Sequence, residues 1–558
     1  MPTARLIGLV LALCGLSITP GWAAGPSASS GDAGESIYLR GVLGSGAPLI
    51  GARGTQGMDA KGADAACVNC HQRSGLGSFE GYNEAITVPP VTGLYLFHAR
   101  GSNAAGPVLP YVEWMHGNRD PYTEETVARA IREGLDSQGR PLHYLMPRYT
   151  LGDADMAALI DYLKQLDVRK VPGVTDTVLH FATVITPDAD PVRRRAMLDV
   201  MEHYFAEKNL FPIGNSRQMR TSGKTEYAKS MFMSHRLWKL HVWDLTGPAS
   251  TWKAQLEKHW SEEPVLAMIS GLGGSNWAPV HAFCEKQAVP CLFANVDAPV
   301  DDNRAFYSLY FSKGVLLEAE LIAKTIASPE QGGAPVKVLQ IYRAGDIGEA
   351  AAPVLAAALK PRGIEVHSQI LKGSGQGQGV AEALRAASAA SGASVLVLWL
   401  RPDDLAALGD ASPAPASVFV SGLMGGMERS PLAPSWRSRA RMAYPVDLPD
   451  KRDLRLRYPL SWFSIHHIDV VDQQLQANTY LACGLLAETL SHMADNLTQP
   501  YLIERLQTSI ERRLINTGYF PHLVLGWNQH FVSKGGYIVH FADAGGAGLV
   551  ADSDWVVP

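Results

Sequence analysis

The chain has 558 residues, which exceeds what a single hydrophobic core normally holds, so two or three domains are expected. Charged residues make up 18% of the sequence, and the formal net charge at pH 7 is −5. This balance of charges gives no indication of binding to nucleic acid or to an anionic membrane surface.

Residues 1–23 have the pattern of an export signal. Arg5 supplies a short positive region, residues 6–18 are apolar, and a small-x-small cleavage site ends at Ala23. Cys14 follows a bulky leucine where a lipoprotein signal has a small residue, so lipidation is not expected. No later apolar run is long enough to span a bilayer. We therefore expect a cleaved signal peptide and a protein located in a bacterial periplasm.

Cys67, Cys70 and His71 have the C-x-x-C-H spacing of a covalent c-type haem site. Two thiols one helical turn apart can each add to a vinyl group of the porphyrin, and the adjacent imidazole then becomes the proximal iron ligand. A structural zinc site would need a second Cys/His pair, and a thioredoxin-type pair would follow a strand. A simple disulfide would leave His71 unexplained. The motif therefore predicts one covalent haem c with its iron.

Two helices are predicted further along. Thr123 can cap the first, which Gly134 ends, and Asp153 can cap the second, which runs to Leu166. Between them lies Met146, which is followed by a proline. We predict Met146 as the sixth iron ligand, because a thioether favours ferrous iron and raises the reduction potential.

Other residues compete with Met146 for this role, and a methionine more often only fills a core. The alternative ligands are Met58, Met115, His116 and His143.

Residues 34–166 resemble the class I cytochrome c family. The resemblance rests on the C-x-x-C-H motif, on residues 122–134, on the Met146–Pro147 step and on the terminal helix at 153–166. It implies an all-α fold around one low-spin haem, which exchanges single electrons with a periplasmic redox partner protein. Ligation by His71 and Met146 would close the sixth position, so a haem enzyme is not expected.

Residues 167–176 are predicted to be a short linker, after which strands and helices alternate. Strands are expected at 178–185, 237–242, 265–269, 290–293, 336–342, 364–367, 395–400 and 418–420, and helices at 191 onwards, 250–260, 313–326 and 346–360. Such alternation predicts parallel sheets. Two sheets in succession predict two α/β lobes with a cleft between them.

Residues 177–558 resemble type I periplasmic solute-binding proteins of the branched-chain amino-acid-binding type, which serve ABC transporters. The matching segments are 269–279, 337–366, 478–490 and 520–539. The resemblance implies that a small organic solute binds in the cleft. Ser270, Ser275 and Asn276 would then contact its carboxylate and Asp346 its ammonium group, although such turn residues also serve as caps or loop residues.

The remaining cysteines and a histidine pair have simpler interpretations. Cys284 and Cys291 flank a predicted loop, and an oxidising compartment would let them form a disulfide. Cys483 lies in an apolar helical run and is predicted to be a buried small hydrophobe. His466 and His467 are adjacent, so they point apart on a helix and are predicted to be structural instead of metal ligands.

Two functions follow from these patterns. The first is an electron-transfer protein whose second domain binds a small solute or docks a partner. The second is a ligand-binding or sensing module of a periplasmic oxidation or uptake pathway, whose haem reports the redox state. No Walker loop, nucleophile elbow or H-E-x-x-H motif occurs, so no catalytic residue is predicted and the protein is not expected to be an enzyme.

Overall fold

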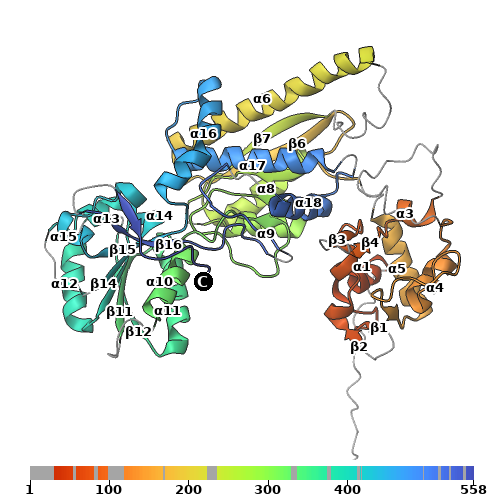
Figure 1. Cartoon of the computed structure of the whole chain (residues 1–558), viewed down its shortest axis with the longest axis horizontal. Helices are drawn as coiled ribbons and strands as arrows, with labels where there is room; N and C mark the ends of the chain where they lie inside the picture. Colours follow the sequence, from red (N-terminus) through yellow and green to blue (C-terminus); the bar gives the residue numbers. More distant parts are fainter. Residues whose placement is uncertain are drawn as a thin grey trace, which may run out of the picture. The chain divides into compact units, whose positions relative to one another are not determined.

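The structure, a computed structural model, divides the chain into two compact units, and the first of them ends at Leu166 (Figure 1). The predicted signal peptide and Ser275 lie outside the residues that it describes. The described residues are 30–53, 58–80, 86–98, 119–166, 170–222, 236–274, 276–328, 336–373, 377, 379–410, 415, 417–493, 496–512, 517–526, 529–543 and 548–558.

The first unit is built on two helices that pack closely against each other, α1 and α5. A Cβ atom at Gly34 in α1 would lie 2.1 Å from the carbonyl oxygen of Ala158 in α5, so only glycine permits this approach. The rings of Tyr38 and Tyr162, with centroids 5.3 Å apart, extend the same contact. The described helical segments are α1 (Ser30–Arg40), η1 (Gly62–Ala65), α2 (Val68–His71), α3 (Gly93–Phe97), α4 (Glu124–Glu133) and α5 (Asp153–Gln165).

The first unit also contains strands, so the expectation of an all-α domain is only partly correct. A small antiparallel sheet has the order β2-β1-β5, and β3 pairs with β4. These segments connect the helices, and pairing satisfies backbone groups that the connections would otherwise leave without partners. The strands are β1 (Ile50–Arg53), β2 (Met58–Lys61), β3 (Ser78–Glu80), β4 (Ile86–Val88) and β5 (Arg148–Tyr149).

The caps of α4 are as predicted, and that of α5 is not. The Thr123 hydroxyl accepts a hydrogen bond from the Thr126 amide at 3.2 Å, and Gly134 ends α4 with φ of 72°. At α5 the cap position is Gly152, and Asp153 is the first helical residue. The Asp153 carboxylate instead forms an ion pair of 2.8 Å with Arg132.

The second unit has two lobes. Lobe 1 is a parallel sheet of order β10-β9-β8-β6-β7, formed by β6 (Val178–Ile185), β7 (Leu237–Asp244), β8 (Ala267–Ile269), β9 (Cys291–Leu292) and β10 (Ser308–Leu309). Its larger helices are α6 (Pro191–Ser222), α8 (Trp252–Glu262), α9 (Ala278–Gln287), α16 (Pro449–Ile465), α17 (Gln473–Ser491) and α18 (Gln499–Arg512). As predicted, Pro191 begins α6, and the Asp190 carboxylate caps it by accepting from the Val192 and Arg193 amides.

Lobe 2 is a sheet of order β12-β11-β13-β14-β15-β16-β17, in which the last two strands are antiparallel. Its strands are β11 (Lys337–Arg343), β12 (Glu365–Leu371), β13 (Val395–Trp399), β14 (Ser417–Ser421), β15 (Ala440–Tyr444), β16 (Tyr537–Phe541) and β17 (Leu549–Ala551). Helices α10 (Val315–Ile326) and α11 (Gly348–Leu359) cover one face and α12 (Val380–Ser391) covers the other (Figure 1). Every residue of β13 is buried, as expected for a parallel strand covered on both faces. Shorter helical turns are α13 (Pro402–Ala406), α14 (Gly422–Gly425), η4 (Met427–Arg429) and α15 (Pro434–Arg437).

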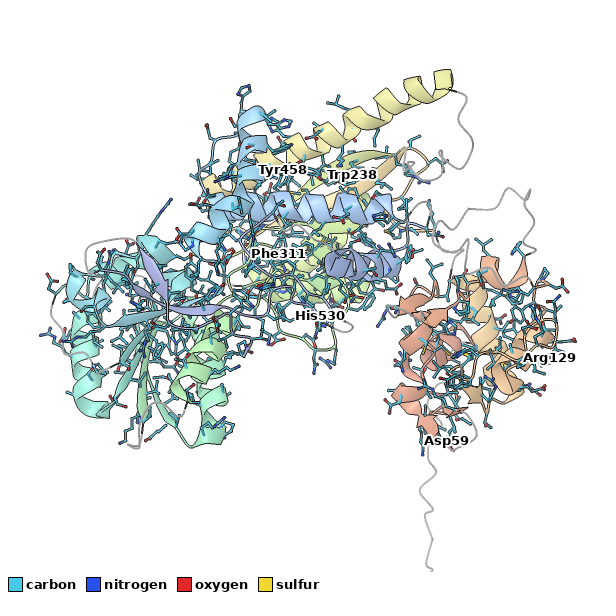
Figure 2. All side chains as sticks on the ribbon, in the orientation of Figure 1. Asp59, Arg129, Trp238, Phe311, Tyr458 and His530 are labelled. Atoms are coloured by element: carbon cyan, nitrogen blue, oxygen red, sulfur yellow. A yellow bond between two sulfur atoms is a disulfide. The ribbon has the colours of Figure 1, made fainter. Side chains whose placement is uncertain are left out.

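The chain passes between the lobes after β10, after β15 and before β16. Two of these connections are hydrogen-bonded to each other. The Tyr310 amide donates to the carbonyl of His530 at 2.8 Å, and the Ser533 amide donates to that of Phe311 at 2.6 Å (Figure 2). These two connections are therefore held together by backbone hydrogen bonds around one parallel β-bridge, between Tyr310 and Phe531.

The last residues of the predicted linker, 171–174, pack on lobe 1. Gly173 has φ of +73°, and a Cβ atom there would lie 2.1 Å from the amide nitrogen of Leu266. The amide of His180 donates to the Gly173 carbonyl at 2.8 Å. Val171 and Val174 pack against the lobe's hydrophobic core.

Across the described part of the chain, no helix combines the length and the apolar character that crossing a bilayer requires.

Candidate haem site and interlobe cleft

Cys67 and Cys70 of the C-x-x-C-H motif lie on one helical turn. Cys67 is the N-cap of α2, and the His71 amide donates to the Cys67 carbonyl at 2.9 Å. Neither cysteine is in a disulfide, and both are only partly exposed. Burial raises the pKa of the Cys67 thiol to about 12, so this sulfur is protonated at neutral pH.

The His71 imidazole is buried, and its Nδ1 lies 2.9 Å from the carbonyl oxygen of Pro89. When Nδ1–H donates to this carbonyl, the lone pair is on Nε2, which is how a metal-binding histidine is usually oriented. Burial lowers the pKa of His71, so the ring is neutral at pH 7. A neutral imidazole with a fixed tautomer is a competent iron ligand.

The backbone after the motif is held by α1. Gln72 has φ of 65°, a left-handed conformation that turns the chain away from α2. Its carbonyl accepts a hydrogen bond from the Tyr38 hydroxyl at 2.7 Å. Because Tyr38 also packs on Tyr162 of α5, the motif is tied to the helix pair at the centre of the unit.

Met146 lies in the loop that leads into β5, and it is partly buried. Its carbonyl accepts a hydrogen bond from the Arg148 guanidinium. Tyr149, three residues after Met146, is buried. Burial is the main cause that raises the pKa of Tyr149, and the charges of Cys67 and Cys70 raise it further. The electrostatic effect requires that Tyr149 lie close to both cysteines, so the strand that follows Met146 passes beside the haem motif.

Of the alternative iron ligands, only His143 has a side chain that the structure describes. His143 is exposed, and its Nδ1 accepts a hydrogen bond from the Leu145 amide at 3.3 Å. Met115 and His116 lie outside the described residues, and the side chain of Met58 is not described either.

The residues around the motif fit a covalently attached haem. Neither Cys67 nor Cys70 is in a disulfide, so both sulfurs can form thioethers, and His71 offers an oriented nitrogen. Arg53 Nε and Gln72 Oε1 are buried and have no hydrogen-bond partner among the described residues. A carboxylate of the cofactor would supply the acceptor that Arg53 lacks.

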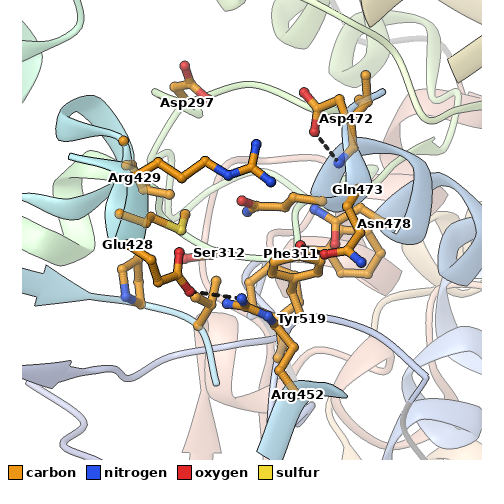
Figure 3. Close-up of a pocket in the computed structure, with 18 of the residues that line it drawn as sticks. Asp297, Phe311, Ser312, Glu428, Arg429, Arg452, Asp472, Gln473, Asn478 and Tyr519 are labelled. Atoms are coloured by element: carbon orange, nitrogen blue, oxygen red, sulfur yellow. Dashed lines mark hydrogen bonds and ion pairs between the residues drawn. The ribbon is translucent and has the colours of Figure 1, made fainter. Parts of the chain in front are cut away.

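A cleft of about 1110 Å³ lies between the lobes of the second unit (Figure 3). Its lining comes from the segments after β9, β13 and β14, from the first turns of α17 and from the connections between the lobes. Open α/β sheets bind ligands at the carboxyl ends of their parallel strands. The cleft is therefore at the position where this fold binds small molecules.

Most of the charged side chains in the cleft are paired with each other. The pairs are Arg193 with Asp472 at 2.9 Å, Arg452 with Glu428 at 2.8 Å and Arg401 with Asp297 at 3.6 Å. Arg401 also pairs at 2.9 Å with Asp346, which does not line the cleft. Arg429 also lines the cleft, and Figure 3 shows its guanidinium extending into the open space. Burial raises the pKa of the neighbouring Tyr519 to about 12, and the charges of Arg452 and Arg429 act in the opposite sense.

Of the ligand-binding residues predicted from the sequence, Ser270, Asn276 and Asp346 do not line this cleft, and Ser275 lies outside the described residues. Ser270 is fully buried, and its hydroxyl donates to Thr479 at 2.9 Å and accepts from Asn295 at 2.9 Å. Asn276 is exposed and accepts from the Ala278 amide at the start of α9. Asp346 is bound by Arg401, so its charge is not available to an ammonium group.

The sequence interpretation missed Arg429, Gln473 and Asn478, which all line the cleft. One signal was present: Gly425 and Gly426 follow a predicted strand, and such a turn often borders a ligand site. Gln473 and Asn478 carried no such signal, because both lie on a long helix.

The three remaining cysteines of the described residues and the pair His466–His467 lie outside both candidate sites. Cys284 and Cys291 are joined as a disulfide, with Cα atoms 6.1 Å apart, and Cys483 is a buried free thiol whose pKa burial raises to about 12. His466 at the end of α16 packs on the Trp462 ring, with centroids 4.2 Å apart, whereas His467 has φ of 56°. Among the described residues, no group of three or more His, Cys, Asp or Glu side chains is arranged to hold a metal ion.

Comparison with known families identifies the first unit. Residues 60–167 match the family model described as Cytochrome c. The chain therefore carries a cytochrome c domain, and this family implies covalently bound haem c with its iron. A comparison with curated protein sequences found no match.

Solved structures similar to this chain are described as ABC transporter or periplasmic substrate-binding proteins. A fatty acid ABC transporter substrate-binding protein from Thermomonospora curvata is 15% identical, with 70% of this chain and 95% of that chain covered and a TM-score of 0.48. A substrate-binding periplasmic protein from Ralstonia solanacearum is 12% identical, with coverage of 67% and 100% and a TM-score of 0.49. A branched chain amino acid ABC transporter from Thermus thermophilus with bound valine is 12% identical, with coverage of 68% and 97% and a TM-score of 0.48.

Proposed function

We propose that this protein carries single electrons in the bacterial periplasm through one covalent haem c, and that it binds a small organic solute in the cleft of its second unit. The observation that carries the electron-transfer role is the geometry of the C-x-x-C-H segment. Cys67 and Cys70 lie one turn apart and are not in a disulfide, and the adjacent His71 is buried and oriented by Pro89. The bound haem would supply a one-electron couple between ferric and ferrous iron.

In this proposal His71 and Met146 are the axial ligands. The Pro89 carbonyl holds the His71 ring in the tautomer that leaves Nε2 for the iron. The Arg148 guanidinium donates a hydrogen bond to the carbonyl of Met146 and so holds the backbone there. Tyr149, three residues after Met146, lies beside the two cysteines. A neutral thioether in the sixth position favours the reduced state and leaves no open site for a substrate. The protein is therefore proposed to exchange electrons with a redox partner protein without enzymatic activity of its own.

The solute-binding role is supported by the form of the cleft. It lies at the carboxyl ends of parallel strands, and it combines apolar walls with charged groups fixed in ion pairs. The three connections between the lobes provide the joint about which such a cleft closes.

A second candidate function is redox sensing, which the presence of the haem motif and the cleft on one chain favours. Here, solute binding would change the reduction potential of the haem. Potentiometric titration with and without a bound solute separates the two functions, because a pure electron carrier keeps the same potential in both conditions.

Mass spectrometry and optical spectra of the exported protein test the main proposal. The expected mature mass is that of a chain cleaved near Ala23 with one haem added, and the reduced protein is expected to have the absorption bands of a low-spin c-type haem. A colourless protein with free Cys67 and Cys70 thiols would refute the electron-transfer role.

A further inference from the structure

The cleft of the second unit offers little to a cationic group. Three of its four carboxylates are already bound to arginines: Asp297, Glu428 and Asp472. The fourth, Asp450, is exposed and is followed by the exposed Lys451. An ammonium group would therefore have to displace a resident guanidinium or rely on a carboxylate screened by water.

Arg429 is in the opposite situation. The part of the chain that the structure describes provides no ion pair and no hydrogen bond for its guanidinium, which extends into the cleft in Figure 3. The three other arginines of the lining are each paired with a carboxylate, whereas Arg429, which is exposed, is paired with none among the described residues. A planar guanidinium in this position is suited to a carboxylate, which it can bind through two parallel hydrogen bonds.

Two amide side chains of α17 face Arg429 across the cleft. The Oε1 atom of Gln473 accepts a hydrogen bond from the Tyr519 hydroxyl at 2.8 Å. This bond uses the oxygen of the amide and not its Nε2 donor. Asn478 is only 8% exposed, and its Oδ1 has no partner among the described residues. A buried acceptor is costly to leave unpaired, so a ligand hydroxyl or amide donor is the group that this position lacks.

Aromatic rings cover the space beside these polar groups. Phe311 and Phe520 line the cleft with their rings 5.4 Å apart and inclined by only 25°. Both side chains are buried, as is the neighbouring Leu475. Such a wall favours an apolar or aromatic ligand body.

We propose that the cleft takes a small organic acid that has an apolar or aromatic body and a hydroxyl group but no ammonium group. Its carboxylate binds Arg429 from lobe 2, and its hydroxyl donates to Asn478 Oδ1 from lobe 1. Because the two groups come from different lobes, the acid links them and favours the closed cleft. This inference rests on the proposed solute-binding function and specifies its ligand class.

Calorimetry on the full-length holoprotein tests this inference with matched ligands. The probes are L-phenyllactate, L-phenylalanine, phenyllactamide and phenethylamine, with 2-hydroxyisocaproate and L-leucine as an aliphatic pair. Each hydroxy acid is expected to bind at least ~10-fold more tightly than the amino acid of the same skeleton, because the carboxylates of the cleft are bound to arginines or, at Asp450, exposed to water. The neutral amide is expected to bind at least ~10-fold more weakly than the acid.

Variants assign the effect to named residues. Arg429→Gln is expected to weaken hydroxy-acid binding at least ~10-fold. Asn478→Leu is expected to remove the preference for L-phenyllactate over 3-phenylpropionate, a further probe that carries a hydrogen in place of the hydroxyl. Arg439→Gln is the matched control, since Arg439 is an exposed arginine of the same lobe that does not line the cleft. It is expected to bind as tightly as the unaltered protein.

The outcomes separate this inference from the function on which it rests. Equal or tighter binding of the amino acids, the amide or the amine would overturn the acid assignment and leave solute binding intact. Hydroxy-acid binding that survives Arg429→Gln would overturn it as well. If none of the probes binds at millimolar concentration, the proposal that the cleft binds an organic acid fails, and solute binding loses its support. The electron-transfer role is tested separately, by the haem spectrum.

Discussion

The haem motif and the interlobe cleft differ in how much of the chain is needed to form them. The motif occupies five consecutive residues, and one helical turn brings its two thiols and its imidazole together. The cleft takes its lining from Arg193 to Leu549, so residues far apart in the chain become neighbours only after both lobes have formed. The haem motif can therefore be recognised from residue spacing in the sequence, whereas the cleft can be recognised only in the folded structure.

Removing both motif cysteines has the largest expected effect. The double variant Cys67→Ala, Cys70→Ala is expected to contain no covalently bound haem, because no sulfur remains to form a thioether. Denaturing gel electrophoresis followed by a haem stain measures this. Cys483→Ala is the control and is expected to retain full haem content, because Cys483 is buried in α17 of the other unit. Loss of haem from the control as well would show that the haem content reports folding instead of attachment.

Replacing Met146 tests whether the haem site extends beyond the motif. Met146→Ala is expected to open the sixth position, so that added imidazole binds the ferric haem, and to lower the reduction potential by on the order of 100 mV. Spectroscopic titration and potentiometry measure the two changes. His143→Ala, three residues away and exposed, is expected to change neither quantity. If His143→Ala opens the site and Met146→Ala does not, the assignment of the ligand is wrong.

The buried carboxyl group of Glu318 provides a test of how stability depends on pH. It is fully buried in α10, and burial raises its pKa to about 8, while hydrogen bonds from Ser421 and Leu423 act in the opposite sense. A carboxyl whose pKa is higher in the folded state contributes stability at low pH, and this contribution declines as the pH rises from about 4.5 towards 8.

Glu318→Gln is therefore expected to reduce the fall in melting temperature of the second unit between pH 5 and 8. Differential scanning calorimetry at several pH values measures this, with the exposed Glu382→Gln of the same lobe as control. An identical pH dependence in the unaltered protein and the Glu318→Gln variant would contradict the prediction.

The smallest effect is expected at the cap of α4. Thr123→Ala removes the hydroxyl that accepts from the Thr126 amide, and it is expected to lower the stability of the first unit by ~1 kcal/mol. Asp153→Ala, at an exposed ion pair, is expected to have a smaller effect. Thermal unfolding of both variants, monitored through the haem absorption, compares them. A larger loss for Asp153→Ala would reverse the ranking of cap and surface ion pair.

Local patterns predicted local structure well. The strand at β6 and the helix at α10 lie close to the predicted ranges, because apolar runs of these lengths have few alternatives. Patterns that depend on distant partners were less informative. Asp153 looked like a cap, but Arg132 is its partner, and the linker residues around Gly173 turned out to pack on lobe 1.

The same distinction explains the ligand residues of the cleft. Ser270 follows a buried strand and therefore looked like a contact for a carboxylate, but Thr479 and Asn295 from other segments use its hydroxyl. Asp346 looked available to an ammonium group until Arg401 was seen to bind it. Whether a polar side chain is free for a ligand depends on its neighbours in space, which spacing along the chain does not specify.

The sequence by itself predicted the cytochrome c domain with its C-x-x-C-H motif and the alternation of strands and helices, because helical turns and strands involve residues that are close in the chain. Only the tertiary structure decided that the charges of the cleft are paired and that Arg429 is left over, because ion pairing depends on which side chains the folded lobes bring within a few ångströms of each other.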